Sequence, residues 1–135
     1  ADVVKISDEE VQFLFDLAPE AGAEYLQQCL NIPLVFVTCG SDGCIFRNAK
    51  AHGHVDSLQG IQVVDTTGAG DIFGGSAVWQ LLQTGKEPAA LDQADLLRIV
   101  RFACTAAGLS TTKHGGISSI PSLADIYAAL PNETI

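Results

Sequence analysis

The chain has 135 residues, of which 47% are hydrophobic and 17% charged, and its formal net charge at pH 7 is −9. This length accommodates one domain with a real core, and the low share of charged residues argues against disorder. The acidic balance disfavours unaided binding to nucleic acid, but small anionic ligands stay possible because backbone amides and Mg²⁺ neutralise phosphate locally.

The first part of the chain predicts a strand followed by two helices. Residues 2–6, which include Val3, Val4 and Ile6, are expected to form a short buried strand. Ser7 is followed by Glu10 at the spacing of a capping box, which predicts a capped helix start. A second helical run is expected from about residue 21 to residue 30, and Pro33 breaks it.

The middle of the chain predicts four strand-like segments. Residues 34–38 are continuously apolar, as in strands buried in parallel sheets. Residues 40–43 predict a turn, and residues 44–46 predict the returning strand of a hairpin. A weaker edge strand is expected within residues 51–58, and another strand over residues 61–64.

The strand at 61–64 leads into a glycine-rich turn, Asp65-Thr66-Thr67-Gly68-Ala69-Gly70-Asp71, and then into a helical run, Ile72–Leu82, for which Gly85 is the expected stop. The amides of Gly68, Ala69 and Gly70 can face one point, and a helix N-terminus adds positive charge there. This layout is typical of phosphate handling. Asp71 would repel a phosphate, so its position predicts a general base that takes a proton from an attacking hydroxyl.

The remaining segments predict helices. Gly74 and Gly75 each cost a helix about 1 kcal/mol relative to alanine, so we expect close packing of this helix against a neighbour. Asp92 or Asp95 is expected to start another helix, and a terminal helix is expected around residues 123–130. Strands that alternate with helices indicate an α/β fold with a largely parallel central sheet.

Cysteine and hydropathy patterns bear on metal binding and location. The chain has four cysteines and none stands in a C-x-x-C pair, which favours reduced core thiols in a cytosolic protein. No apolar run reaches the roughly 18 residues of a membrane span, and no secretory leader is recognisable, so we expect a cytoplasmic protein without a membrane partner. The sequence contains no Met, which suits a fragment of a longer protein or a processed form.

The segment Asp65–Phe73 resembles the second signature of the ribokinase-like (PfkB) carbohydrate kinases. Other segments extend the resemblance, in the family's order, over almost the whole chain: Ala1–Glu10, which is most similar to fructokinases, Val37–Gly43, and Phe102–Ala107 with Gly115 and Gly116. The resemblance implies a three-layer α/β/α ribokinase-like (Rossmann-like) fold. Residues 1–135 would be a single α/β domain, the nucleotide-binding and catalytic half of such a kinase. The amino-terminal half, with most sugar contacts and the lid, lies outside this sequence.

The resemblance implies an ATP-dependent, fructokinase-like sugar kinase that transfers the γ-phosphate to a sugar hydroxyl. Asp71 would be the general base, and the amides of Gly68, Ala69 and Gly70 would form the anion hole. Two other functions stay open: a nucleotide-binding half-domain without kinase activity, and a degenerate homologue used as a regulator, which the intact Gly-Ala-Gly-Asp disfavours. The residues themselves also allow an ordinary first-turn acid and a glycine-rich helix cap.

The family's nucleotide site corresponds to two groups of residues here: Thr38, Gly40, Ser41 and Gly43, and then Cys104 and Ala107. The first group would supply amides and a hydroxyl to the ATP phosphates, or would only form a tight turn. The second group lies on a small-residue face that would accept adenine, or would only pack against another helix.

The resemblance also implies two cations. Glu10 would help to place Mg²⁺ through water, a role compatible with the capping box, while the metal itself bridges the ATP phosphates. A monovalent cation, K⁺ in many members, would lie beside the anion hole, although not every member depends on it. Its shell would be Asp65, Thr67, Ser110, Lys113, Gly115 and Ser119.

Some properties are not specified by these residues. The identity of the sugar depends on sequence outside this chain, and fructose is favoured only by the resemblance at Lys5–Glu10. If the chain exists alone, an exposed apolar sheet edge would favour self-association into a homo-oligomer. Trp79 and the phenylalanines are expected in the core.

Overall fold

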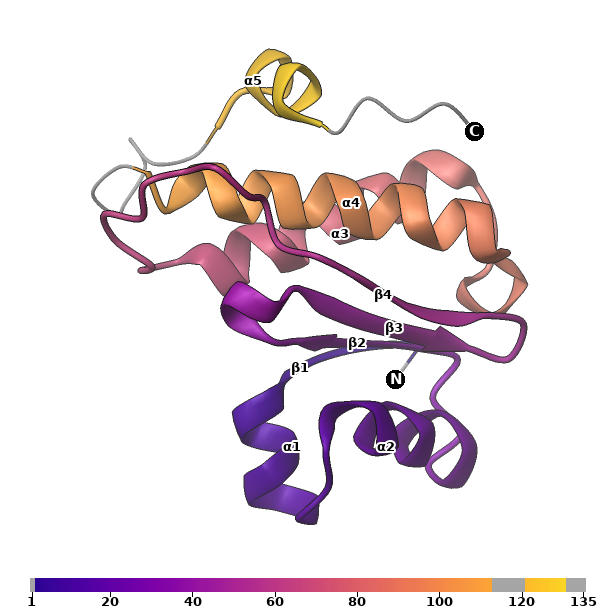
Figure 1. Cartoon of the computed structure of the whole chain (residues 1–135). Helices are drawn as coiled ribbons and strands as arrows, with labels where there is room; N and C mark the ends of the chain where they lie inside the picture. Colours follow the sequence, from indigo (N-terminus) through magenta and orange to yellow (C-terminus); the bar gives the residue numbers. More distant parts are fainter. Residues whose placement is uncertain (1, 113–120, 131–135) are drawn as a thin grey trace.

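The computed structural model describes residues 2–112 and 121–130 of the chain. Its centre is a four-stranded sheet in the order β1-β2-β3-β4 (Figure 1). The strands are β1 (Val3–Ser7), β2 (Leu34–Thr38), β3 (Cys44–Asn48) and β4 (His52–Val55). β1 and β2 are parallel, whereas β2–β3 and β3–β4 are antiparallel pairs.

The α/β class is confirmed, but the expectation of a largely parallel sheet is wrong for the described residues. The connections that follow β2 and β3 are short turns, one of them a 3₁₀ turn at Gly40–Asp42. Parallel neighbours need a long crossover, so these two turns can only produce antiparallel pairs. Only the β1-to-β2 connection, which contains helices, is long enough for a parallel arrangement.

Helices cover both faces of the sheet, as the three-layer expectation requires (Figure 1). On one face lie α1 (Asp8–Phe15) and α2 (Pro19–Glu24), the latter continued by a π-helical segment, Tyr25–Cys29. On the other face lie α3 (Ala69–Thr84) and α4 (Gln93–Ser110), which are joined through a 3₁₀ turn at Pro88–Ala90. The short helix α5 (Leu123–Ala129) packs on the outer side of α4.

Two apolar clusters hold the layers together. The larger one lies between the sheet and the α3–α4 layer and includes Phe36, Phe46 and Phe73. The smaller one lies between the sheet and the α1–α2 layer, where Val11 is fully buried. A Cβ added at Gly22 would lie 2.3 Å from Val11 Cγ1, so glycine at this position lets α2 approach α1.

The helix limits follow the local signals in the sequence. Ser7 is the N-cap of α1 and forms the predicted capping box with Glu10. Gly85 ends α3 in the left-handed conformation, as predicted. Asp92 and Asp95 act together at the start of α4, because Asp92 is the N-cap and Asp95 completes a second capping box.

Two expectations about these elements need correction, and a third is confirmed. Residues 61–64 are not a strand: the amides of Val64 and Asp65 donate to Thr111 O, at the end of α4, rather than to a neighbouring strand. The edge strand expected within residues 51–58 is confirmed as β4. Phe13 lies outside the core, because 88% of it is exposed.

Trp79 is also less buried than expected, with 38% of its surface exposed. Its ring lies 5.6 Å from that of Phe102, between centroids. No helix in the described part of the chain is both long enough and apolar enough to cross a membrane.

Candidate active site

The glycine-rich turn places the N-terminus of α3 at one edge of the sheet (Figure 1). Gly68 is the N-cap of α3 with φ of 79°, a conformation in which glycine carries no Cβ penalty. The amide of Ala69 donates to Thr66 O at 3.2 Å, so this amide is engaged within the turn. Asp71 follows in the first helical turn with an exposed side chain. A hydroxyl and a phosphate in solution can therefore reach this carboxylate.

The carboxyl ends of β1 and β2 bring a second group of predicted residues together. Ser7 and Thr38 are register partners at the last positions of the two parallel strands. Glu10 Oε1 accepts a hydrogen bond from Ser7 N at 3.0 Å, and Ser7 Oγ accepts one from Glu10 N at 3.1 Å. These bonds, backbone first, lower the pKa of Glu10, and the positive charge of Lys5 adds to the effect. Glu10 is thus an exposed, ionised carboxylate at this edge.

Lys5 links β1 to the start of α3. Its Nζ donates to Gly70 O at 3.2 Å, although the two residues are 65 positions apart. The sequence alone predicts no chemistry for Lys5. The signal that could have found it is a charged residue inside an otherwise apolar strand, Val3–Ser7.

The turn after β2 is attached to the segment after β4. Gly43 has φ of 93°, and a Cβ there would lie 2.0 Å from Val55 O, so only glycine fits. The ring of His54 hydrogen-bonds with Asp42 O, and Ser57 Oγ donates to Ser41 O at 2.6 Å. Of the predicted phosphate residues in this turn, Gly40 and Ser41 are exposed, whereas Gly43 is buried.

A cavity of about 470 Å³ opens next to this turn. It is lined by the end of β4 and the following segment, by α4 and by α5; the residues are His54, Val55, Asp56, Ser57, Leu58, Gln59, Arg101, Thr105 and Ala129. Its volume falls within the range of about 300–1,000 Å³ that is usual for small-molecule sites. The cavity is therefore large enough for a nucleoside-sized group.

The residues predicted for adenine, Cys104 and Ala107, are not among those that line this cavity. Cys104 is buried in the larger apolar cluster, and burial raises the pKa of its thiol to about 12. Ala107 packs against the same cluster. The α4 residues that line the cavity are Arg101 and Thr105, which the sequence analysis missed; their spacing of four places them on one helix face.

The predicted monovalent-cation residues are partly brought together. Asp65 Oδ1 accepts from Thr67 N at 2.9 Å, and Asp65 N donates to Thr111 O at 3.0 Å. The second bond joins the turn before α3 to the end of α4. Ser110, near that end, is buried, and its hydroxyl donates a hydrogen bond to Ala107 O. Lys113, Gly115 and Ser119 lie outside the described residues.

Within residues 2–112 and 121–130, no group of three or more His, Cys, Asp or Glu side chains is arranged to hold a metal ion. The donors at the site are oxygens, above all the ionised Glu10 carboxylate. Such donors fit a magnesium ion that takes most of its ligands from water and phosphate.

Comparison with known proteins gives a consistent family assignment. The family described as pfkB family carbohydrate kinase matches residues 1–123. The chain is 36% identical over 134 residues to fructokinase-2 of Solanum lycopersicum, covering 96% of this chain and 39% of that protein. It is 35% identical over 128 residues to fructokinase-1 of Zea mays, covering 93% of this chain and 38% of that protein. The chain thus spans about two fifths of the length of these curated relatives.

Solved structures share the fold. Fructokinase from Vibrio cholerae, in a form bound to fructose, ADP and calcium, superposes with a TM-score of 0.79 at 36% identity, covering 97% of this chain and 41% of that one. Fructokinase from Xylella fastidiosa with bound ATP superposes with a TM-score of 0.81 at 28% identity, covering 96% of this chain and 42% of that one. Ribokinase from Giardia lamblia superposes with a TM-score of 0.83 at 26% identity, covering 96% of this chain and 44% of that one. The ribokinase-like fold class is confirmed.

Proposed function

The chain belongs to the pfkB family of carbohydrate kinases, and from this premise we propose that the protein containing it is an ATP-dependent, fructokinase-like sugar kinase. Residues 1–135 would be its nucleotide-binding and catalytic half. One observation carries the proposal: the glycine turn that begins α3, with Asp71 in its first helical turn, is bonded through Gly70 O to Lys5 of β1, the strand that ends at Ser7 beside Thr38.

In the proposed reaction Asp71 is the general base. Its carboxylate takes the proton of a sugar hydroxyl while the hydroxyl oxygen forms a bond to the γ-phosphorus. The bond between that phosphorus and the bridging oxygen breaks, and ADP leaves. The amides of Gly68, Ala69 and Gly70 would stabilise the charge on the transferred group. Ala69 would have to exchange its bond to Thr66 O for one to the phosphate.

ATP would extend from the cavity towards α3. Its base and ribose would occupy the cavity beside Arg101 and Thr105, with Cys104 and Ala107 on the same helix. Its phosphates would pass the turn after β2, where the contacting residues would be Thr38, Gly40, Ser41 and Gly43. Two observations support that direction: the size of the cavity, and the hydrogen bond from Ser57, which lines the cavity, to Ser41 O in this turn.

Two cations are part of the proposal. Magnesium, when bound, would neutralise phosphate charge, with Glu10 holding one of its waters. A monovalent cation would lie near Asp65, Thr67 and Ser110, with Lys113, Gly115 and Ser119 as further ligands. Among the solved relatives, a Vibrio cholerae fructokinase variant is described with potassium and an Escherichia coli ribokinase II with Mg²⁺ and ATP.

The location proposed for the protein is the cytoplasm. Cys39, Cys44 and Cys104 are free and buried, which suits a reducing compartment.

The second candidate is a nucleotide-binding half-domain without activity of its own. The chain covers 39% of fructokinase-2 of Solanum lycopersicum, so the activity of residues 1–135 on their own is tested separately. The test is ADP release from ATP by the protein containing this chain, measured against a panel of sugars, with nucleotide binding to residues 1–135 measured in parallel. Sugar-dependent ADP release supports the kinase. Nucleotide binding without turnover on any sugar supports the half-domain instead.

A further inference from the structure

The side chain of Lys5 leaves β1 on the face that α3 covers. Val4 and Ile6 pack with the cluster of the α1–α2 layer, while Val3 packs with the larger cluster on the α3–α4 side. Because side chains alternate along a strand, Lys5 shares the face of Val3. It reaches the first turn of α3, where its Nζ lies 3.2 Å from Gly70 O.

Two glycines on α3 lie against this lysine. A Cβ at Gly70 would lie 3.3 Å from Lys5 Nζ, and a Cβ at Gly74 would lie 3.5 Å from Lys5 Cδ. Gly75, by contrast, faces open space within 4 Å. The close packing expected for this helix is wrong at Gly75, and at Gly74 a Cβ would only be in ordinary van der Waals contact with the lysine. Because Gly70 and Gly74 are four residues apart, they lie on the same face of α3, and the side chain of Lys5 lies along this face.

Lys5 has no direct ion pair within the described part of the chain, although its charge acts at longer range on the Glu10 carboxylate. No described carboxylate forms an ion pair with its Nζ within 4.0 Å. Its described hydrogen bond, to Gly70 O, uses one of the three ammonium protons. A helix N-terminus carries partial positive charge, so a cation beside it is unfavourable unless an anion is also bound. A lysine without a direct ion pair at this place therefore favours an anion as its further partner.

We propose that Lys5 binds the terminal phosphate of ATP and stabilises the negative charge of the phosphoryl group during its transfer. This inference rests on the proposed kinase function. Gly70, to which Lys5 is bonded, directly precedes Asp71, and the base must reach the hydroxyl that attacks the phosphorus. The phosphate next to Lys5 is therefore the one in transfer. The ammonium keeps its bond to Gly70 O and directs its other protons at the phosphate oxygens.

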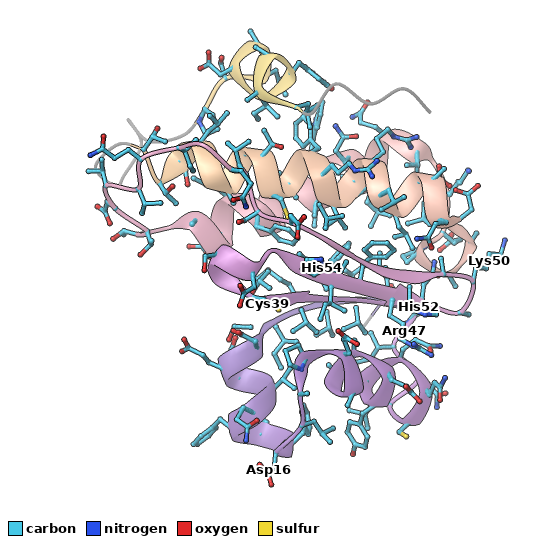
Figure 2. All side chains as sticks on the ribbon, in the orientation of Figure 1. Asp16, Cys39, Arg47, Lys50, His52 and His54 are labelled. Carbon is cyan, nitrogen blue, oxygen red and sulfur yellow. The ribbon has the colours of Figure 1, made fainter. Side chains whose placement is uncertain are left out.

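The competing explanation is structural: Lys5 would only fasten β1 to α3. Lys5→Met separates the two, because methionine keeps an apolar stem over Gly74 but carries no charge. Lys50→Met is a matched control with the same change of charge. Lys50 lies at the turn between β3 and β4, at the opposite end of the sheet from Cys39, and its Nζ is 3.4 Å from Ala90 O (Figure 2).

The experiment measures the affinities of the protein containing this chain for AMP, ADP and a non-hydrolysable ATP analogue, together with kcat. Lys5→Met is expected to weaken binding of the ATP analogue by about 10- to 100-fold, the range of one or two charge-assisted hydrogen bonds. It should leave AMP binding unchanged and lower kcat. Lys50→Met should match the wild type in all four measurements.

The inference is overturned if Lys5→Met shifts only the thermal midpoint and keeps the wild-type preference for the ATP analogue over AMP together with wild-type kcat. Lys5→Gln provides a second neutral variant if the methionine variant does not fold. Tripolyphosphate binding separates this failure from that of the proposed function. If the wild type phosphorylates no sugar but binds tripolyphosphate more tightly than Lys5→Met does, the proposed kinase function is refuted and the anion site at Lys5 is supported. A wild type that binds no tripolyphosphate overturns the lysine role.

Discussion

Ser7 and Thr38 are paired residues at the last positions of the parallel strands β1 and β2. The pairing places the N-cap of α1 beside the hydroxyl that precedes the turn after β2. Ligand sites of α/β proteins lie at the carboxyl ends of parallel strands, because the following loops and helix N-termini meet there. In this chain the N-terminus of α3 is also joined to β1, because Lys5 Nζ donates a hydrogen bond to Gly70 O.

Replacing Asp71 with asparagine should remove turnover and spare nucleotide binding. The amide cannot take the proton of the acceptor hydroxyl, so kcat is expected to fall by about 10²- to 10⁴-fold. Steady-state kinetics and calorimetric binding of an ATP analogue to the protein containing this chain are the measurements. Asp125→Asn, at the first turn of α5, is the control for loss of an ordinary first-turn acid. Near-wild-type kcat for Asp71→Asn would refute the role of general base.

Two glycines of one turn should respond differently to alanine. Gly43 has a positive φ, and its added Cβ would meet Val55 O, so Gly43→Ala should cost about 3 kcal/mol or more of unfolding free energy. Gly40 also has a positive φ but faces open space, so Gly40→Ala should cost about 1 kcal/mol. Urea unfolding of both variants is the measurement. Equal costs would contradict the close approach of this turn to the end of β4.

Asp95 should make stability depend on pH at the acid end. This buried carboxylate accepts hydrogen bonds from Lys86 at 2.7 Å, from Arg98 at 3.3 Å and from Asp92 N at 3.2 Å. The bond from Lys86 is the largest cause that lowers the pKa of Asp95. A lowered pKa in the folded state means stabilisation that is complete above the unfolded value of about 4 and is lost as pH falls through the folded value.

Asp95→Asn should therefore lower the unfolding free energy near pH 7, and the difference from wild type should shrink as pH falls below about 4. Urea unfolding across a pH series measures it. Glu24→Gln, on the exposed surface of α2, should give a curve parallel to the wild type. A constant difference between Asp95→Asn and wild type at all pH values would show that its ionisation does not matter.

Asn48 should be intolerant of substitution, because its amide joins three parts of the chain. Its Nδ2 donates to Pro88 O at 3.0 Å and Leu91 O at 2.9 Å, while its Oδ1 accepts from Lys50 N and Ala51 N. Asn48→Ala leaves these groups without partners and should cost about 3 kcal/mol or more. Asn48→Asp keeps the accepting oxygen but replaces the donating Nδ2 with a second oxygen. This oxygen would face the carbonyl oxygens of Pro88 and Leu91 and repel them, so aspartate should not restore stability. Thermal unfolding of both variants decides; a rescue by aspartate would contradict the amide's role as donor.

Local features of the fold were predictable because their causes lie within a few residues. The capping box needs only Ser7 and Glu10 in sequence, and the end of α3 needs only the conformational freedom of Gly85. The strand Leu34–Thr38 is recognisable because a continuous apolar run suits a strand covered on both faces. The expected strand at residues 61–64 failed because a strand also needs a partner, and the amides of Val64 and Asp65 bind Thr111 O instead.

The candidate site divides in the same way. By itself, the sequence determined the family, and it predicted a phosphate-handling turn from Gly68 to Asp71, since glycine spacing and a first-turn acid are local patterns. Only the tertiary structure decided that Lys5 reaches Gly70, and that Arg101 and Thr105, rather than Cys104, line the cavity. These contacts join residues far apart in the chain. Their geometry depends on how β1, α3 and α4 pack around one core, and no short window of sequence contains that information.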